Sequence, residues 1–216
     1  MNAKRTVRGY ANAGFAGILM EDQVAPKACG HTRNRRVLPR AEAVARVRAA
    51  CDERDEGTGG DIVVFARSDA RSAESLDEAL WRVAAFADAG ADALFIDALR
   101  TREEMEAFCR VAPGVPKMAN MLEGGGSTPI CTPKELEEMG FKVVAYPLTL
   151  LAVTARAMEK ALVEIRDEGY PDEAAMPTFE ELKGIVGFPQ YYHEEARYDT
   201  LHAAHVPPIP KQPPAP

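Results

Sequence analysis

The stretch DIVVFARSDARSAESLDEALWRVAAFADAGADALFIDA (residues 61–98) contains the unit from which the fold can be predicted. It begins with an apolar run, 61–69, that is typical of a buried strand. Ser75 and Glu78 then have the spacing of a capping box, which predicts that a helix begins after Ser75. A second apolar run, 92–98, follows this helix. A buried strand, a helix and another buried strand predict a parallel β–α–β unit.

The chain repeats this unit along most of its length. Five apolar strands are expected, at residues 15–21, 61–69, 92–98, 115–122 and 142–148. Helices are expected before Gly14, over 41–54, and from Ser75 to Ala89, Thr101 to Val111, Thr132 to Met139, Thr149 to Glu168 and Thr178 to Gly187. Near-continuous apolar strands that alternate with helices predict a parallel sheet covered on both faces.

Two α/β architectures are compatible with five such units. An open doubly wound sheet could end here, but no GxGxxG follows the first strand, so a dinucleotide site is unsupported. The alternative is a (β/α)8 TIM-type barrel lacking its first three βα units, with five parallel strands and extra C-terminal helices. Segment 1–14 resembles the helix of a βα unit, and we favour the partial barrel over residues 1–192. Residues 193–216 are expected to form a tail, rich in proline and disordered from residue 206.

Composition argues against several classes of function. The 216 residues are 46% hydrophobic and 27% charged, with a formal net charge of -7 and a pI near 5.2. Such an acidic chain is not expected to bind nucleic acid or an anionic membrane as its main partner. No apolar run approaches the roughly 20 residues that span a bilayer. The four cysteines form no CxxC pair, so we expect free thiols in a reducing compartment rather than a secreted protein.

Polar side chains follow each predicted strand at its carboxyl end, where ligands bind in both candidate architectures. They are Glu21, Asp22, Arg67, Asp69, Asp97, Asn120, Glu123 and Tyr146. Arg67 could hold a carboxylate in a bidentate pair. Three further donors could bind other oxygens of the same anion: Asn120, Ser127 and Thr128. The carboxylates at positions 21, 22, 69 and 97 suit a hard ion such as Mg²⁺.

The segment EDQVAPKACGHTRNRR (residues 21–36) places a thiol, an imidazole and an ammonium on a short loop after the first strand. A thiol between Lys27 and His31 is expected to have a lowered pKa, so Cys29 is a candidate proton donor or acceptor. A free surface cysteine with incidental neighbours is an alternative of equal weight. A zinc site is weakly supported, because Cys29 and His31 have no second ligand pair at the usual spacing. The basic residues nearby could hold a small anion: Arg33, Arg35, Arg36 and Arg40.

Six motifs occur in a specific order between about Thr6 and Tyr192: EDQ, PKACGH, ARSDA, ADALFIDAL, MANMLEGGGSTP and AYPLTL. In this order they resemble the isocitrate lyase/phosphoenolpyruvate mutase superfamily, and most closely its plant and algal carboxyvinyl-carboxyphosphonate phosphorylmutase-like proteins. The resemblance implies a barrel with a mobile loop over the active site and Mg²⁺, with Mn²⁺ as a substitute, as cofactor. It also implies a small anionic 2-oxo or 2-hydroxy acid that is cleaved or formed through an enolate.

The resemblance further implies roles for individual residues. Cys29 lies at the position of the general acid/base of the family's lyases, and Lys27 and His31 match the loop's other functional positions. Arg67 matches the arginine that binds the substrate carboxylate, and Glu21 matches a carboxylate that holds metal-bound water. The remaining substrate-binding positions are Gly30, Asp97, Asn120, Ser127 and Thr128.

Three functions remain open on this resemblance. The first is a Mg²⁺-dependent C–C lyase for a small 2-hydroxy or 2-oxo di- or tricarboxylate, favoured because the family's phosphonomutases have a loop that differs from the one with Cys29. The second is a phosphonomutase or an oxaloacetate-type decarboxylase or hydrolase. The third is a catalytically inactive interaction subunit. Ala28, Thr32 and Asp97 differ from the usual lyase pattern, so the substrate itself stays open.

Three further expectations come from the family. Its first three strands, with the main Mg²⁺ ligands, would precede Met1, so the 216-residue chain is expected to bind Mg²⁺ poorly and to turn over little. Members commonly exchange their last barrel helix between subunits, so we expect a homo-oligomer in which the Thr178–Gly187 helix is exchanged. The plant relatives indicate a chloroplast location, with the cytoplasm as the alternative.

Overall fold

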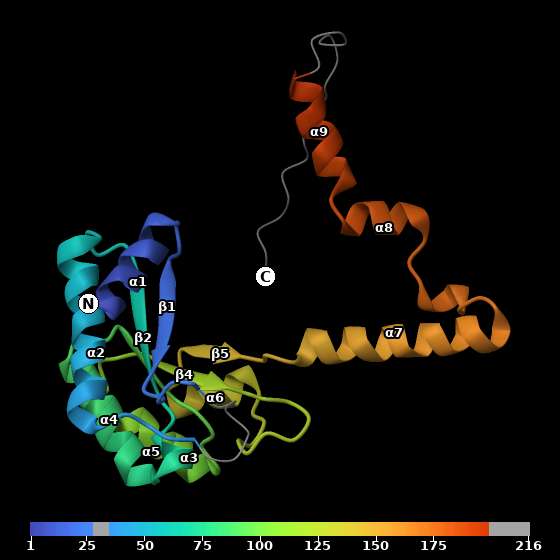
Figure 1. Cartoon of the computed structure of the whole chain (residues 1–216). Coiled ribbons are helices and arrows are strands. Elements are labelled where there is room, and N and C mark those ends of the chain that lie inside the picture. The colour runs from blue at the N-terminus through green and yellow to red at the C-terminus, as the bar shows by residue number, and fades with distance from the viewer. Residues whose placement is uncertain (28–34, 199–216) are drawn as a thin grey trace. The chain divides into compact units, whose positions relative to one another are not determined.

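The computed structural model describes residues 1–27 and 35–198, and its sheet distinguishes the two architectures (Figure 1). The strands are β1 (Gly17–Glu21), β2 (Val63–Ser68), β3 (Ala93–Ile96), β4 (Lys117–Asn120) and β5 (Val143–Ala145). All pairings between them are parallel, and the strands lie side by side in sequence order, β1 to β5. A doubly wound sheet contains a point where the order reverses, whereas a barrel adds each strand beside the previous one. The partial barrel with five parallel strands is therefore confirmed.

All the helices expected from the sequence are present. The helices are α1 (Asn2–Asn12), α2 (Arg40–Asp52), α3 (Ala70–Ala73), α4 (Leu76–Asp88), α5 (Arg102–Arg110), α6 (Pro133–Met139), α7 (Thr149–Glu168), α8 (Phe179–Ile185) and α9 (Phe188–Tyr198), with a π-helical turn at Glu53–Gly57 and a 3-10 turn at Glu173–Ala175. The sequence analysis did not predict α3, α9 or the two turns. Pro189 is compatible with α9 because proline is tolerated in the first turn of a helix.

The helices around the sheet pack on one of its faces, whereas the sequence analysis expected cover on both. Figure 1 shows α1, α2, α4 and α5 on the same side of the strands. This follows from the strand order, because right-handed crossovers that all step in one direction place every helix on the same face. In β2, the buried residues are Val64, Ala66 and Ser68. Phe65 and Arg67 alternate with them, are only half-buried, and therefore belong to the other, interior face.

The hydrophobic core lies between the sheet and these helices. Val64 and Leu94 on the strands are fully buried, as are Phe86 of α4 and Phe108 of α5. The ring of Phe108 contacts that of Phe141, just before β5, with centroids 6.0 Å apart. Each buried side chain of this size contributes roughly 1.5–3 kcal/mol. This packing fixes the positions of the strands, and with them the loops at their carboxyl ends.

The helix N-termini begin where the capping patterns predicted. Thr132 and Thr178 form complete capping boxes with the glutamates three residues later. Ser75 forms only half of one, because its side chain accepts from the backbone N–H of Glu78 while the Glu78 carboxylate does not return the bond. That carboxylate instead accepts hydrogen bonds from Arg40 and Arg82. Ion pairs with Arg40 and Arg82 have thus replaced the returning bond of the capping box, while the Ser75 cap itself is kept.

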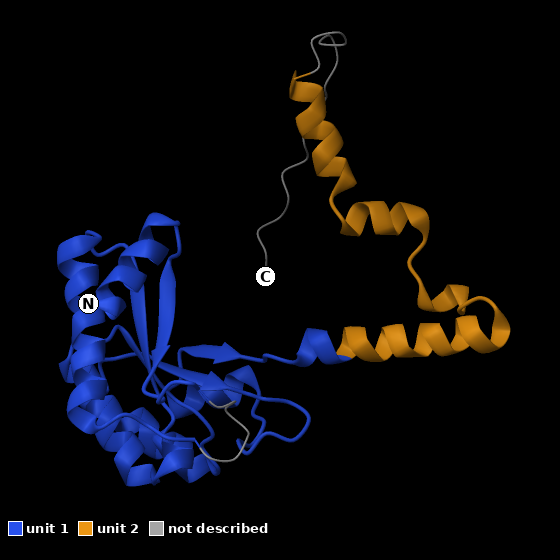
Figure 2. Cartoon of the chain, viewed as in Figure 1, with its two compact units in different colours: residues 1–152 blue, residues 153–216 orange. Residues whose placement is uncertain are grey.

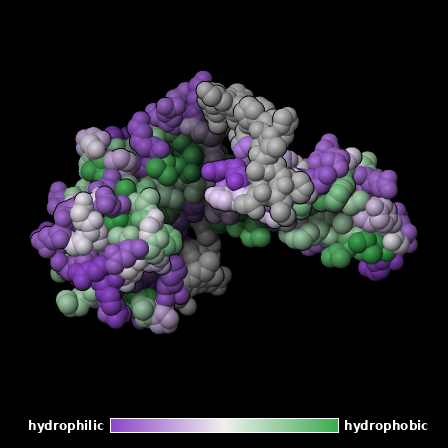
Figure 3. All heavy atoms as spheres, turned by 90° about the horizontal axis from the view of Figure 1, so that it is seen from above, coloured by the Kyte–Doolittle hydropathy of each residue, from purple (hydrophilic) through white to green (hydrophobic). Residues whose placement is uncertain are grey.

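The chain divides into two compact units, residues 1–152 and the part from residue 153 onward (Figure 2). The first unit contains the whole sheet and the beginning of α7. The described helices α7, α8 and α9 contain no buried residue. Apolar side chains on them are exposed, including Leu162, Phe179 and Ile185. Hydrophobic patches are visible in green on the molecular surface in Figure 3.

Candidate active site

The register of the sheet places Arg67 at the centre of the candidate site. Glu21 pairs with Arg67 across β1 and β2, and Arg67 pairs with Phe95 across β2 and β3. Neighbours in register point to the same face of a sheet, so these three side chains share the interior face. The guanidinium carbon of Arg67 lies 5.2 Å from the centroid of the Phe95 ring, within cation–π distance.

Arg67 contacts three carboxylates at the carboxyl ends of β1, β2 and β3. Its Nε and Nη2 donate to the two oxygens of Asp69 at 3.0 and 2.8 Å, and Nη2 also donates to Asp97 Oδ2 at 3.0 Å. Its Nε lies 3.3 Å from Glu21 Oε2. Burial lowers the pKa of Arg67, but the bond to Asp69 and the surrounding carboxylates outweigh this and leave the pKa raised. Among the described residues, Arg67 Nη1 makes no hydrogen bond.

Arg35 is a second cation in the same cluster. Its Nη1 donates to Asp69 Oδ1 at 2.7 Å and its Nη2 donates to Asp97 Oδ2 at 2.8 Å. Only 1% of its side chain is exposed. The sequence analysis assigned Arg35 and Arg40 to a basic patch for a small anion. That assignment does not fit, because Arg35 is buried between two aspartates and Arg40 pairs with Glu78.

Asp22 holds the backbone of this cluster in place. It accepts hydrogen bonds from Ser68 Oγ at 2.8 Å and from the backbone N–H of Asp69 at 2.9 Å. Arg82 of α4 lies on its other side, with Nη1 donating to Asp22 Oδ2 at 3.2 Å. Burial raises the pKa of Asp22, and the two hydrogen bonds and the Arg82 charge oppose that rise. Asp22 therefore fixes the backbone from which the Asp69 side chain reaches Arg67.

The carboxylates expected to suit Mg²⁺ are mostly engaged by arginines. Asp22 is bound by Arg82, and Asp69 and Asp97 are bound by the arginines of the cluster. Within residues 1–27 and 35–198, no three acidic, histidine or cysteine side chains come together as a metal site. Glu21 is also ion-paired, with Lys27 and Arg67, but its buried Oε2 accepts no hydrogen bond in the described part of the chain. Of these four carboxylates, Glu21 is thus the one with a buried oxygen that is available, among the described residues, for Mg²⁺ or for water bound to it.

The loop residues are described only in part. Lys27 Nζ lies 2.7 Å from Glu21 Oε1, and 62% of the Lys27 side chain is exposed. Cys29, Gly30 and His31 lie outside the described residues. The structure therefore brings together four of the predicted site residues at the ends of β1 to β3: Glu21, Lys27, Arg67 and Asp97.

The other predicted substrate-binding residues lie around β4. Asn120 is the last residue of β4, and with Thr128 it lines a cavity of about 10 Å³. Ser127 is exposed in the glycine-rich loop. Within the described residues, no hydrogen bond joins these three to Arg67. Glu123, in the same loop, accepts hydrogen bonds from Leu148 N at 3.1 Å and from the Thr149 hydroxyl, which ties this loop to the start of α7.

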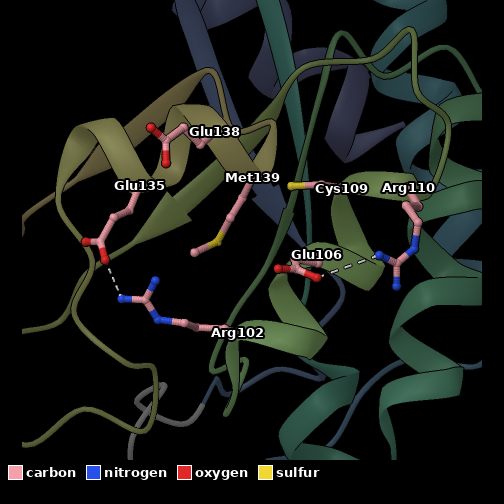
Figure 4. A pocket seen from close by; sticks show the side chains of 7 residues that line it. All are labelled: Arg102, Glu106, Cys109, Arg110, Glu135, Glu138 and Met139. Carbon is pink, nitrogen blue, oxygen red and sulfur yellow. Dashed lines mark hydrogen bonds and ion pairs between the residues drawn. The ribbon is translucent and has the colours of Figure 1, made fainter.

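A larger surface pocket of about 410 Å³ lies between α5 and α6 (Figure 4). Arg102 and Glu135 form an ion pair of 2.6 Å across it. Burial raises the pKa of Cys109, which also lines the pocket, to about 11, so its thiol is a poor nucleophile at neutral pH. None of the predicted site residues lines this pocket, and the candidate site stays at the strand ends.

Sequence reasoning missed two residues that organise the cluster, Ser68 and Arg82, and gave a third, Arg35, a different role. The contacts that join these residues to the cluster span 34 or more positions in the chain: Arg35 binds Asp69 and Asp97, and Ser68 and Arg82 bind Asp22. Arg82 could have been noticed, because it interrupts the apolar face of a helix in the run ALWRVAAF. No comparable signal singles out Arg35 among its basic neighbours.

The order of the parallel strands defines a barrel-type α/β protein. The charged cluster lies at the carboxyl ends of these strands, where barrel enzymes have their active sites. The profile of the family described as Phosphoenolpyruvate phosphomutase matches residues 1–166. The chain belongs to this family, and with it to the isocitrate lyase/phosphoenolpyruvate mutase superfamily.

Similar proteins include lyases, mutases and a hydrolase. The "Carboxyvinyl-carboxyphosphonate phosphorylmutase, chloroplastic" of Arabidopsis thaliana is 39% identical over 209 residues, covering 94% of this chain and 60% of that protein. A crystal structure of 2,3-dimethylmalate lyase has a TM-score of 0.83 at 30% identity and covers 95% of this chain and 68% of that one. Phosphonopyruvate hydrolase, solved with oxalate and Mg++, has a TM-score of 0.73 at 28% identity, covering 91% and 68%.

The chain spans less than two thirds of the length of the Arabidopsis relative. Helices in the described part of the chain are too short or too polar to cross a membrane. The relatives compared above are named as enzymes: a mutase, a lyase and a hydrolase.

Proposed function

We propose that this chain carries the active site of a lyase that cleaves a C–C bond in a small 2-hydroxy or 2-oxo di- or tricarboxylate. The observation that supports it best is Arg67, fixed by Asp69, Asp97 and Glu21 on the interior face of the sheet with Nη1 not engaged among the described residues. A rigid guanidinium with a free donor is suited to bind a carboxylate. The similarity to a dimethylmalate lyase supports the choice of reaction.

In this proposal Arg67 holds one carboxylate of the substrate. Asn120, Ser127, Thr128 and Gly30 are assigned to its other oxygens on the family resemblance, because the cavity that Asn120 and Thr128 line is too small for a substrate. Asp97 keeps Arg67 oriented and borders the same anion. Lys27, whose ammonium is ion-paired to Glu21, and His31 supply positive charge near the reacting end.

The proton chemistry is assigned to Cys29. As the bond between the hydroxyl-bearing carbon and its neighbour breaks, the hydroxyl passes its proton to a water molecule and becomes an oxo group. The electron pair of the broken bond remains on the other fragment as an enolate, and the Cys29 thiol donates a proton to its carbon. A divalent ion such as Mg²⁺, when bound, would supply positive charge to the substrate oxygens, and Glu21 would hold water on that ion.

Turnover assays of the purified chain test this proposal. A panel of 2-hydroxy and 2-oxo dicarboxylates and a phosphonate would be incubated with Mg²⁺, with Mn²⁺ and with a chelator, and products followed by ¹³C NMR. Since the chain is expected to bind Mg²⁺ poorly, we expect slow cleavage of a 2-hydroxy acid into an oxo compound and a shorter acid, detectable only with metal present. Cys29→Ser should abolish this cleavage. Turnover of the phosphonate that survives Cys29→Ser would instead favour a phosphonomutase, the reaction class of the Arabidopsis relative.

We also propose that the protein is a homo-oligomer in which α8 is exchanged between subunits, in the chloroplast or the cytoplasm. The exposure of Phe179 and Ile185 on α8 supports this, because large apolar side chains are usually covered. Sedimentation of the wild type and of a Phe179→Ser/Ile185→Ser variant tests it. A wild type that sediments only as a monomer at all concentrations would contradict the proposal.

A further inference from the structure

We propose that Arg35 sets the affinity of Arg67 for an anionic ligand. It does so by neutralising the two aspartates, whose negative charge would otherwise cancel the positive charge that Arg67 offers to the ligand. This inference rests on the proposed function of Arg67 and extends it to a residue that need not touch the substrate. Arg35 and Arg67 share both aspartates: each donates to Asp69 Oδ1 and to Asp97 Oδ2, at distances of 2.7 to 3.0 Å.

The charges of the cluster balance only when Arg35 is included. The cluster contains three carboxylates, those of Asp69, Asp97 and Glu21. They are ion-paired with three cations, Arg35, Arg67 and Lys27. Both aspartates are buried, so water does little to screen them. Without Arg35, the cluster would have a net negative charge beside Arg67. That charge would repel the carboxylate that Arg67 is proposed to bind.

The backbone around Arg35 is fixed independently of its ion pairs. Arg36 O accepts a hydrogen bond from Val24 N at 2.9 Å, and Leu38 N donates to Asp22 O at 2.8 Å. These bonds join the strand-like segment after Arg35 to the segment that leaves β1. Arg35 therefore enters the cluster from an anchored backbone, which is the property expected of a positioning residue.

The chain offers a matched control in Arg54. It is also a largely buried arginine with several partners, donating to Asp92 Oδ2 at 2.6 Å and to Gly90 O at 2.9 Å. Asp92 precedes β3, so this ion pair lies at the amino end of the strand, whereas Asp97 follows its carboxyl end. Arg54→Gln should cost stability without changing the charge near Arg67.

The experiment measures the dissociation constant of oxalate, without metal, by titration calorimetry on the full chain. We expect Arg35→Gln to weaken oxalate binding by about tenfold or more, because a buried unit charge is lost near the ligand. Arg54→Gln should change the constant by less than about twofold. Arg35→Lys keeps the charge but loses the two-pronged contact with the aspartates, so its effect should lie between those of Arg54→Gln and Arg35→Gln. Circular dichroism would verify that each variant is folded.

A double variant separates a charge effect from loss of structure. Arg35→Gln/Asp69→Asn removes one charge of each sign, restores neutrality, and should recover most of the oxalate affinity lost in Arg35→Gln. If Arg35→Gln does not fold, Arg35→Lys and the double variant still test the proposal. Wild-type affinity in Arg35→Gln, or equal losses in Arg35→Gln and Arg54→Gln, would overturn it. If Arg67→Gln abolishes binding while Arg35→Gln has no effect, only the role of Arg35 falls; a folded wild type that does not bind oxalate overturns both.

Discussion

The substitution Arg82→Gln tests the buried support of the candidate site. Arg82 is 2% exposed in its side chain and donates to Glu78 Oε1 at 2.7 Å and to Asp22 Oδ2 at 3.2 Å. Glu78 keeps Arg40 as a partner in the variant, but Asp22 loses its only ion-paired cation in the described part of the chain. Breaking a buried pair in this way costs about 3–5 kcal/mol. We expect about 3 kcal/mol, which corresponds to a fall of roughly 6–12 °C in Tm.

Urea and thermal unfolding, followed by circular dichroism, measure this loss. The control is Arg46→Gln, because Arg46 forms an even shorter ion pair with Glu42 (2.6 Å) in which both side chains are about half exposed, 49% and 48%. An exposed pair contributes less than about 0.5 kcal/mol. If Arg82→Gln cost no more than Arg46→Gln, burial would not be what makes the Asp22–Arg82 pair important, and the reasoning would be refuted.

The pH dependence of the same variant gives a second test. Burial raises the pKa of Asp22 already in the wild type, so its charged form is disfavoured in the folded state and stability falls as pH rises through that raised pKa. Removal of the Arg82 charge should raise the pKa of Asp22 further. The difference in stability between wild type and Arg82→Gln should therefore be largest at neutral pH and should shrink under acid conditions, where Asp22 is protonated in both.

Three further predictions concern the helices and thiols of the first unit. A backbone hydrogen bond from Thr132 at the start of α6 lowers the pKa of Glu135 to about 2. The stability that this gives is present above the ordinary pKa of 4.5 and is lost as the pH falls toward 2. The Tm of Glu135→Gln should therefore fall less than that of the wild type over this pH range. Gly140 ends α6 with φ at 108°, so Gly140→Ala should cost about 1 kcal/mol in urea unfolding, whereas Gly114→Ala, with open space for its Cβ, should be neutral or slightly stabilising. Burial raises the pKa of Cys51 and Cys109 to about 11, so both should react slowly with iodoacetamide at about pH 8 until urea unfolds the chain, as peptide mass spectrometry would show.

The strands and most helices could be predicted from the sequence because their signals are local. Apolar runs bounded by turn residues marked β1 to β5, and threonine–glutamate spacing located the starts of α6 and α8. The helix α3 could not be found in this way, because a single turn after Asp69 contains no periodicity to detect. The cover of the sheet on one face was also missed, because it depends on the order of the strands in space.

The candidate site was predictable only as a list of strand ends. Register places Glu21 beside Arg67, and this much follows from the strand positions. The commitment of Asp69 and Asp97 to two arginines does not, because Arg35 reaches them from 34 and 62 positions away in the sequence. The same strand-end residues could form either a group of carboxylates free to bind a metal or a group of carboxylates paired with arginines. Only the three-dimensional contacts distinguish these two arrangements.

A crystal structure of the chain with oxalate would test the central claim, that the Arg67 cluster is the carboxylate-binding site, most directly. Our account predicts that one oxalate carboxylate lies within hydrogen-bond distance of Arg67 Nη1, while the contacts of Arg67 with Asp69 and Asp97 remain. Oxalate bound elsewhere, for example in the pocket between α5 and α6, with Arg67 uncontacted, would contradict the account.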